Sequence, residues 1–169
     1  QIVRAESVSF SMSSAAFVSD MCLAVEQGEA TSPAFTRFNC AGAPIPPVLI
    51  ERAWNLMGLR ISSAWGMTEN GAVTLILPED DDERAFTTDG SPLPGVELRV
   101  IDVDGSDMPA GQAGRLLVRS CSNFGGYLRR QQWNATDADG WFDTGDLACL
   151  DAQGYVRITG RSKDVIIRG

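Results

Sequence analysis

Apolar positions in the first 78 residues alternate between a strand pattern and a helical pattern. Residues 36–41 and 59–64 predict two short buried strands, and the second runs into Trp65. Between them, a helix is expected to begin after a run of prolines and to end at Gly58. Its buried face is marked by apolar residues at helical spacing: Leu49, Ile50, Ala53, Trp54 and Met57. This strand–helix–strand order predicts a parallel sheet with crossover helices, and an earlier helix near residues 15–25 fits the same layer.

A second pattern begins after the acidic run at residues 79–83, which itself predicts a solvated loop. Short stretches with period-two alternation follow, separated by Gly, Pro and Asp turns: 96–101, 115–119, 155–158 and 165–167. Such strands predict a small sheet or an open barrel. We therefore expect an α/β fold in which a partial parallel β-α-β layer is followed by a small, distorted β-barrel or β-sheet subdomain. The expected divisions are 1–80, 81–160 and 161–169.

The amino-acid composition argues against several classes of active site and binding partner. The chain has 169 residues, with 14 Lys or Arg against 22 Asp or Glu, a formal net charge of −8, and no histidine. The absence of histidine excludes Ser-His and Cys-His dyads and imidazole-ligated zinc. The acidic balance argues against non-specific binding to nucleic acid or anionic membranes. With no signal peptide and no apolar run of membrane length, the four cysteines are expected to be reduced, mostly packing thiols in a cytoplasmic protein: Cys22, Cys40, Cys121 and Cys149.

The first candidate site is residues 40–44, Cys-Ala-Gly-Ala-Pro, which follow a predicted strand. Small residues at such a place let a flat ligand approach the main chain closely. The alternative is a plain strand-to-helix turn.

The second candidate site is residues 64–71, Ala-Trp-Gly-Met-Thr-Glu-Asn-Gly. An aromatic ring, a glycine, a hydroxyl and a carboxylate in this order could stack a base, hydrogen-bond a phosphate and hold Mg²⁺. The alternative is that Trp65 is a core residue and that Thr68 and Glu69 cap a helix.

The third candidate site joins residues 140–147 with residues 160–164. A turn carboxylate such as Asp146 can accept hydrogen bonds from both hydroxyls of a ribose. Arg161 offers a permanent cationic fork to phosphate or ribose oxygens. The alternative is a β-hairpin with an Asp-Thr-Gly turn and exposed charges.

Taken in order, these segments resemble the adenylate-forming superfamily of acyl-CoA synthetases, adenylation domains and luciferases. Residues 65–69 are similar to its aromatic-Gly-x-Thr-Glu motif, residues 140–147 to Gly-Trp-Phe-x-Thr-Gly-Asp, and residues 160–169 to the Gly-Arg-x-Lys-Asp hinge segment. Three further phrases, residues 40–47, 63–71 and 89–95, look most like the cyclohexanecarboxylate–CoA ligase-type branch. The resemblance implies a reaction in which a carboxylate attacks ATP to give an acyl-adenylate and pyrophosphate, and the thiol of coenzyme A then displaces AMP.

The resemblance also implies a set of residues that bind the nucleotide: Gly42, Ala43, Pro44, Trp65, Gly66, Met67, Asp146 and Arg161. In this set Trp65 would stack on the adenine and Asp146 would bind the ribose diol, with Arg161 on the ribose or phosphate side. Many relatives carry Asn or Asp at the position of Ser63 to read the adenine amino group. Because serine is shorter, that contact is expected from the main chain here.

Two further residues are implied to be catalytic. Thr68 would touch the phosphates, and Glu69 would help to hold Mg²⁺, whose charge offsets the negative charge that develops at phosphorus. Lys163 would be the hinge about which a C-terminal domain swings. The acyl pocket would include Ala41, Ala64 and Gly71.

Both ends of the chain suggest an internal piece of a longer protein, since it starts at Gln1 and stops in a strand-like run. The family's phosphate loop and its C-terminal catalytic lysine are expected outside this piece, so the piece alone is expected to be inactive. The expected partners are a small carboxylic acid, ATP and coenzyme A, without nucleic acid and without a membrane span. Two alternatives stay open: a stand-alone nucleotide-binding or interaction module, and an aspartic protease homodimer built on residues 141–145.

Overall fold

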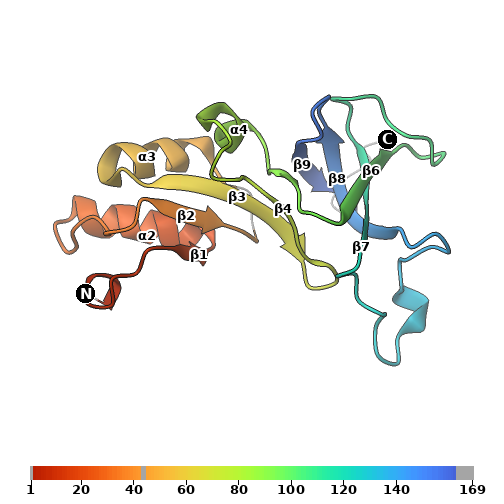
Figure 1. Cartoon of the computed structure of the whole chain (residues 1–169), viewed down its shortest axis with the longest axis horizontal. Helices are drawn as coiled ribbons and strands as arrows, with labels where there is room; N and C mark the ends of the chain where they lie inside the picture. Colours follow the sequence, from red (N-terminus) through yellow and green to blue (C-terminus); the bar gives the residue numbers. More distant parts are fainter. Residues whose placement is uncertain (1, 43–44, 163–169) are drawn as a thin grey trace, which may run out of the picture.

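The chain forms two β-sheets that lie side by side, with strands β3 and β4 of the first reaching toward the second (Figure 1). The computed structural model describes residues 2–42 and 45–162. The fold is α/β, a mixed sheet that contains parallel strands followed by an antiparallel sheet, as the sequence predicts. The divisions at residues 80 and 160 stay predictions.

The first sheet has the strand order β1-β2-β3-β4-β5, and its first three strands are parallel. Its strands are β1 (Ser11–Ser13), β2 (Arg37–Cys40), β3 (Arg60–Met67), β4 (Gly71–Leu75) and β5 (Ser91–Pro92). Helices α2 (Ala15–Glu26) and α3 (Pro47–Met57) make the crossovers, after a short α1 (Ile2–Ala5). The two connections, β1-α2-β2 and β2-α3-β3, move across the sheet in the same direction. Because such connections are right-handed, both helices lie on the same face of the sheet.

The core of this layer is formed by the apolar faces of α2, α3 and the parallel strands. Ala53, Leu59 and Ile61 are among its most buried members. The end of α3 agrees with the prediction, because Gly58 takes a left-handed conformation (φ 63°) and its N–H bonds back to Trp54 O.

The second sheet is an antiparallel meander, with the strand order β6-β7-β8-β9. Its strands are β6 (Val96–Ile101), β7 (Gly114–Ser120), β8 (Phe142–Leu150) and β9 (Val156–Arg161), with a 3₁₀ turn (Gln131–Trp133) between β7 and β8. The strands predicted at 96–101, 115–119 and 155–158 are confirmed. The strand predicted at 165–167 lies outside the described residues.

The acidic run is largely exposed, as predicted, but only its first three residues form a loop. It leads into helix α4 (Asp82–Thr87), and the side chain of Asp81 caps this helix by accepting a hydrogen bond from the N–H of Arg84 (2.8 Å). Carboxylates suit this position because the first turn of a helix carries unpaired N–H groups and a partial positive charge.

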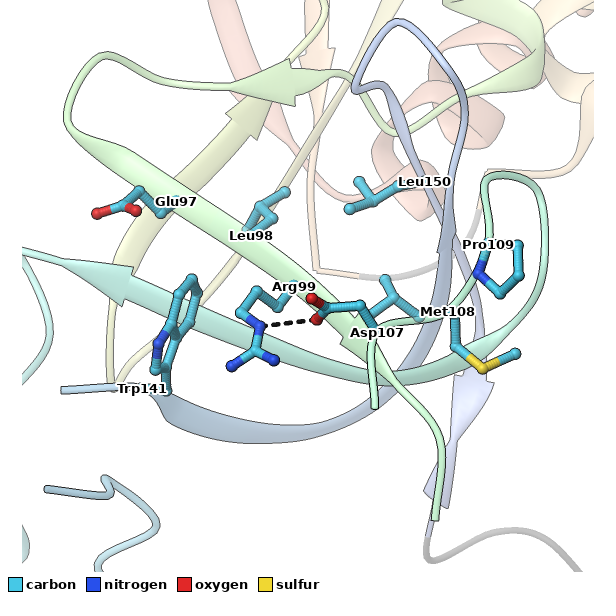
Figure 2. A pocket seen from close by; sticks show the side chains of 9 residues that line it. Glu97, Leu98, Arg99, Asp107, Met108, Pro109, Trp141 and Leu150 are labelled. Atoms are coloured by element: carbon cyan, nitrogen blue, oxygen red, sulfur yellow. Dashed lines mark hydrogen bonds and ion pairs between the residues drawn. The ribbon is translucent and has the colours of Figure 1, made fainter. Parts of the chain in front are cut away.

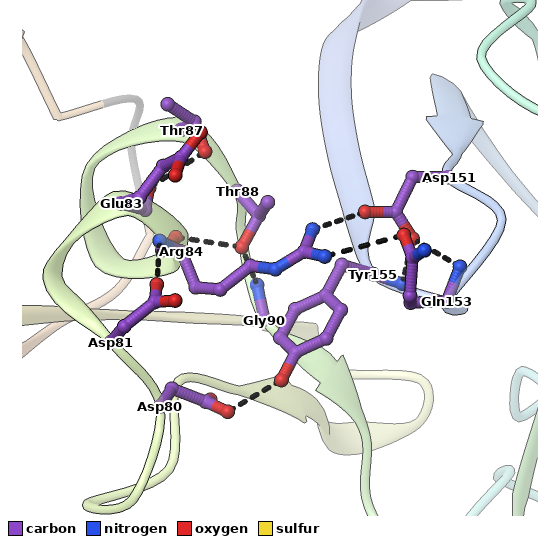
Figure 3. A network of polar contacts seen from close by, with 10 residues as sticks. All are labelled: Asp80, Asp81, Glu83, Arg84, Thr87, Thr88, Gly90, Asp151, Gln153 and Tyr155. Atoms are coloured by element: carbon purple, nitrogen blue, oxygen red, sulfur yellow. Dashed lines mark hydrogen bonds and ion pairs between the residues drawn. The ribbon is translucent and has the colours of Figure 1, made fainter.

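Helix α4 ties the two sheets together through one polar network (Figure 3). The Arg84 guanidinium pairs with Asp151, in the turn between β8 and β9, and lies 4.3 Å from the centre of the Tyr155 ring. The Tyr155 hydroxyl in turn donates to Asp80 Oδ1 (2.5 Å). Since these contacts join segments about 70 residues apart, they hold the second sheet against the first.

Gly90 lies at the junction of the sheets, and its replacement is expected to weaken the fold strongly. Its φ is 94°, and a Cβ atom there would come within 2.3 Å of the main-chain carbon of Leu75. Gly90→Ala is therefore expected to lower the free energy of unfolding by about 3 kcal/mol or more. Gly105→Ala is the matched control, because Gly105 also has a positive φ (86°) but open space around it; about 1–2 kcal/mol is expected there. Equal losses in urea unfolding would contradict the close approach at Gly90.

Candidate functional site

Two hollows of comparable size stand out among the described residues. The first, about 530 Å³, follows the outer edge of β6; it includes Trp141 of the third candidate segment but none of the residues to which a catalytic or binding role is assigned (Figure 2). Its Trp141 ring lies 5.3 Å from the Arg99 guanidinium, which is itself paired with Asp107 (2.8 Å). The second, about 450 Å³, lies between β3 and β9 and contains most of the predicted site residues that fall within the described ranges.

Three predicted residues meet in this second cleft. The indole Nε1 of Trp65 donates to Asp146 Oδ2 (3.0 Å), and Arg161 Nε lies 3.2 Å from Asp146 Oδ1. The Asp146 side chain is 7% exposed, whereas that of Arg161 is 69% exposed. A buried carboxylate is thus held between an aromatic ring and a cation that faces solvent.

The main chain explains why these groups meet. Asp146 pairs with Arg161 across the β8–β9 ladder, and opposite charges on facing strands attract. Trp65 reaches the pair from β3 and packs on the core of the second sheet. The prediction that Asp146 lies in a turn, and the alternative of a hairpin with an Asp-Thr-Gly turn, are both wrong: residues 143–145 lie inside β8, where Gly145 (φ 72°) accommodates the local distortion.

The Trp-Gly-Met-Thr-Glu segment begins in β3 and ends in the turn before β4. Gly66 fits only because it has no side chain, since a Cβ atom would come within 2.0 Å of Gly71 O. Thr68 and Glu69 lie in the turn, so the alternative in which they cap a helix is wrong. Thr68 is exposed, and neither residue lines the cleft.

Glu69 has a partner that the sequence did not indicate. The Tyr127 hydroxyl donates to Glu69 Oε1 (2.5 Å), and this hydrogen bond raises the pKa of Tyr127. The N–H of Phe124 also donates to Glu69 O (2.7 Å), and the Phe124 ring packs edge-on against that of Tyr127. The connection between β7 and β8 therefore fixes both the main chain and the carboxylate of Glu69.

A second carboxylate in the cleft was also missed. Asp89 Oδ1 accepts a hydrogen bond from Ser63 Oγ (2.9 Å), and Asp89 Oδ2 accepts one from the N–H of Ile158 (2.9 Å). The sequence offers one local sign of Asp89, an acidic residue directly before a glycine in a short loop. Its partners cannot be read from the sequence, because they lie 26 and 69 positions away.

The other predicted residues divide into three groups. Gly42, Ala64, Gly66 and Met67 line the cleft. Ala41 and Gly71 do not line it. The remaining predicted residues lie outside the described part of the chain: Ala43, Pro44 and Lys163.

The cysteines differ in environment. Cys22 and Cys40 are buried, and burial raises the pKa of the Cys40 thiol to about 11, which suits a packing role. Cys121 is exposed and Cys149 is partly buried, and all four are free thiols. The cytoplasmic location stays a prediction.

Two kinds of feature are absent from residues 2–42 and 45–162. No group of three or more His, Cys, Asp or Glu side chains is arranged to hold a metal ion. No helix in these ranges has the length and apolar character needed to cross a bilayer.

Comparisons with known proteins agree on one family. The family model described as AMP-binding enzyme matches residues 1–128. A medium-chain fatty-acid–CoA ligase from Escherichia coli (strain K12) is 34% identical over 155 residues, which are 90% of this chain and 27% of that protein. The chain spans about a quarter of the length of the curated relatives it matches.

Solved structures show the same fold. ATP-bound MatB from Rhodopseudomonas palustris matches with a TM-score of 0.83 and 28% identity, over 98% of this chain and 33% of that one. The amide bond synthetase McbA from Marinactinospora thermotolerans matches with a TM-score of 0.85 and 27% identity, over 98% and 34% of the two chains. No support emerges for the protease alternative, and the Asp143 carboxylate on which it depends is paired with Arg115 (2.8 Å).

Proposed function

Because this chain belongs to the AMP-binding enzyme family, we propose that the whole protein is an ATP-dependent acid–CoA ligase whose nucleotide site is the cleft between β3 and β9. The reaction activates a carboxylic acid as its adenylate and transfers the acyl group to coenzyme A. The observation that carries the proposal is the buried Asp146 carboxylate held between Trp65 and Arg161.

The proposed roles follow from the donors and acceptors in the cleft. A carboxylate can accept about four hydrogen bonds, so Asp146 keeps acceptor positions for a ribose diol after Trp65 and Arg161 have taken theirs. The Trp65 ring offers an aromatic face to a base. Arg161 adds an exposed positive charge at the mouth of the cleft, where phosphate oxygens would lie.

The residues present fit a Mg²⁺ ion that arrives with the nucleotide. Mg²⁺ is bound in nucleotide enzymes by one or two carboxylates together with phosphates and water, rather than by a cage of protein ligands. Glu69 supplies one such carboxylate: it does not line the cleft itself but lies two residues beyond Met67, which does, and among the described residues it belongs to no larger acidic cluster. The ion, when bound, would neutralise charge on the phosphates. Tyr127 and Phe124 orient Glu69 for that contact.

The acid is proposed only as a class. Ala64, Gly66 and Met67 give the cleft a small, apolar wall, which suits an alicyclic, aromatic or medium-chain acid. Coenzyme A is proposed as the acceptor because the similar curated proteins include CoA ligases, whereas McbA is named as an amide bond synthetase. Residues 1–169 alone are proposed to be inactive. The second candidate is a binding module that holds a nucleotide without turnover, which the same cleft would permit.

Acid-dependent exchange of pyrophosphate into ATP tests the proposal in the full-length protein. Cyclohexanecarboxylate, benzoate and octanoate form the acid panel, and acyl-CoA formation is followed separately with coenzyme A present. Exchange with at least one acid, and none with residues 1–169 alone, is expected. Nucleotide binding without exchange for any acid would favour the binding module.

A further inference from the structure

Asp89 lies on the wall of the same cleft, and the roles proposed above do not include it. Its main chain is fixed between the two sheets: Asp89 N–H donates to Val156 O (2.7 Å), and Asp89 O accepts from Thr74 Oγ1 (2.6 Å). The next residue, Gly90, accepts a hydrogen bond from the N–H of Val156 (2.9 Å) and lies so close to Leu75 that there is no room for a Cβ atom. Since its main chain is held from both sides, the Asp89 side chain has a defined position at the cleft wall.

The carboxylate of Asp89 determines what Ser63 can do. Ser63 has a single hydroxyl hydrogen, which it donates to Asp89, so toward a ligand the hydroxyl can only accept. The main-chain oxygen of Ser63 already accepts from the N–H of Ile76 (3.0 Å). Both residues are largely shielded, since 16% of the Asp89 side chain and 7% of the whole Ser63 residue are exposed. The pair therefore presents hydrogen-bond acceptors to the cleft.

We propose that Asp89, together with Ser63, selects the base of the nucleotide by accepting hydrogen bonds from its exocyclic amino group. This inference rests on the nucleotide function proposed above. A 6-aminopurine brings two N–H donors to such a pair, whereas a 6-oxopurine brings an acceptor and leaves the buried oxygens unpaired. Buried polar groups that lose their partner are costly, so the pair discriminates between the two bases.

The position of the pair fits a nucleoside. Ser63 and Trp65 are two residues apart on β3, so their side chains point to the same face about 6–7 Å apart. Asp146 contacts Trp65, and Asp89 contacts Ser63. One carboxylate thus stands at each end of the wall, Asp146 for the sugar and Asp89 for the base. Arg157, whose Nη1 lies 3.8 Å from Asp89 Oδ2, is held on the same side.

The test is the ratio of kcat/KM for ATP to that for ITP, measured by pyrophosphate exchange in the full-length protein. The unaltered protein is expected to prefer ATP by about 100-fold. Asp89→Asn is expected to lower this ratio at least about tenfold, because the amide can donate to a 6-oxo group. Ser63→Ala keeps the link between Asp89 and Ile158 and is expected to lower the ratio about threefold. Asp107→Asn, in the other hollow, is the control and should leave the ratio unchanged.

Loss of folded protein lowers the rates with ATP and with ITP by the same factor, so it leaves their ratio unchanged. The ratio therefore separates base selection from the structural role of Asp89 between the sheets. If the ATP-to-ITP ratio of Asp89→Asn stays within twofold of that of the unaltered protein, the inference is wrong. If Asp89→Asn does not fold, the same criterion is applied to the ratio of Ser63→Ala. If no acid supports exchange, the proposed function fails, and calorimetry with AMP and IMP then tests base selection by itself. Equal affinities for AMP and IMP would overturn it.

Discussion

Asp146→Ala in the full-length protein is expected to lower kcat/KM for ATP about 10³-fold. The substitution removes a charge-assisted acceptor for two ribose hydroxyls, each worth about 1.5–3 kcal/mol. It also leaves the Trp65 N–H without its acceptor and Arg161 without its counter-charge. Pyrophosphate exchange at varied ATP concentration measures the effect.

The Asp146 prediction has two matched variants. Asp146→Asn keeps one oxygen acceptor and should fall between Asp146→Ala and the unaltered protein. Asp107→Ala removes an exposed carboxylate that also pairs with an arginine, and its kcat/KM should stay within about twofold. If Asp146→Ala, shown to be folded by circular dichroism, behaves like Asp107→Ala, the ribose assignment is wrong.

Glu69→Gln is expected to lower kcat for adenylate formation by about 10²–10³-fold, because a carboxylate that supports the metal and the charged transition state is lost. The Mg²⁺ concentration needed for half-maximal rate should rise in the same variant. Tyr127→Phe leaves the carboxylate in place but removes the hydrogen bond that orients it, so a smaller loss of about tenfold is expected.

A metal-binding measurement and a control variant separate the proposed role of Glu69 from any effect of its replacement on the stability of the fold. Binding of Mn²⁺ to the ATP complex, followed by electron paramagnetic resonance, should weaken in Glu69→Gln and less in Tyr127→Phe. Glu97→Gln, an exposed carboxylate paired with Arg119, should change neither the rate nor Mn²⁺ binding. Unaltered Mn²⁺ binding in Glu69→Gln would remove Glu69 from the metal site.

Local patterns were sufficient for much of the fold. Prolines before α3 and Gly58 after it fix that helix in the sequence, and period-two alternation marks β6 over the residues observed. The order of the three motifs was also sufficient to place Trp65, Asp146 and Arg161 in one cleft. Each of these signals is formed by residues close together in the chain, so it can be recognised in one sequence.

The errors arose where long-range pairing overrides local chemistry. Residues 143–145 have the composition of a turn, yet the ladders to β7 and β9 hold them inside β8. The acidic run is largely exposed, as its charge predicts, but its composition does not reveal that Asp81 caps a helix.

The two site residues that were not predicted, Tyr127 and Asp89, also depend on long-range contacts. Tyr127 and Asp89 act on groups 58 and 26 positions away in the chain, and a contact of that kind leaves no pattern near either residue. Asp89 opens one of the phrases that carry the resemblance, residues 89–95, but the resemblance implied no role for it. Only the arrangement of the two sheets brings these side chains to the site.

The most direct test of the central claim is a crystal structure of the full-length protein with AMP or a non-hydrolysable acyl-adenylate mimic. The nucleotide is expected between β3 and β9, with its ribose hydroxyls within hydrogen-bond distance of Asp146 and its base beside Trp65. Nucleotide density in the hollow along β6, or density between β3 and β9 that does not contact Asp146, would contradict the account.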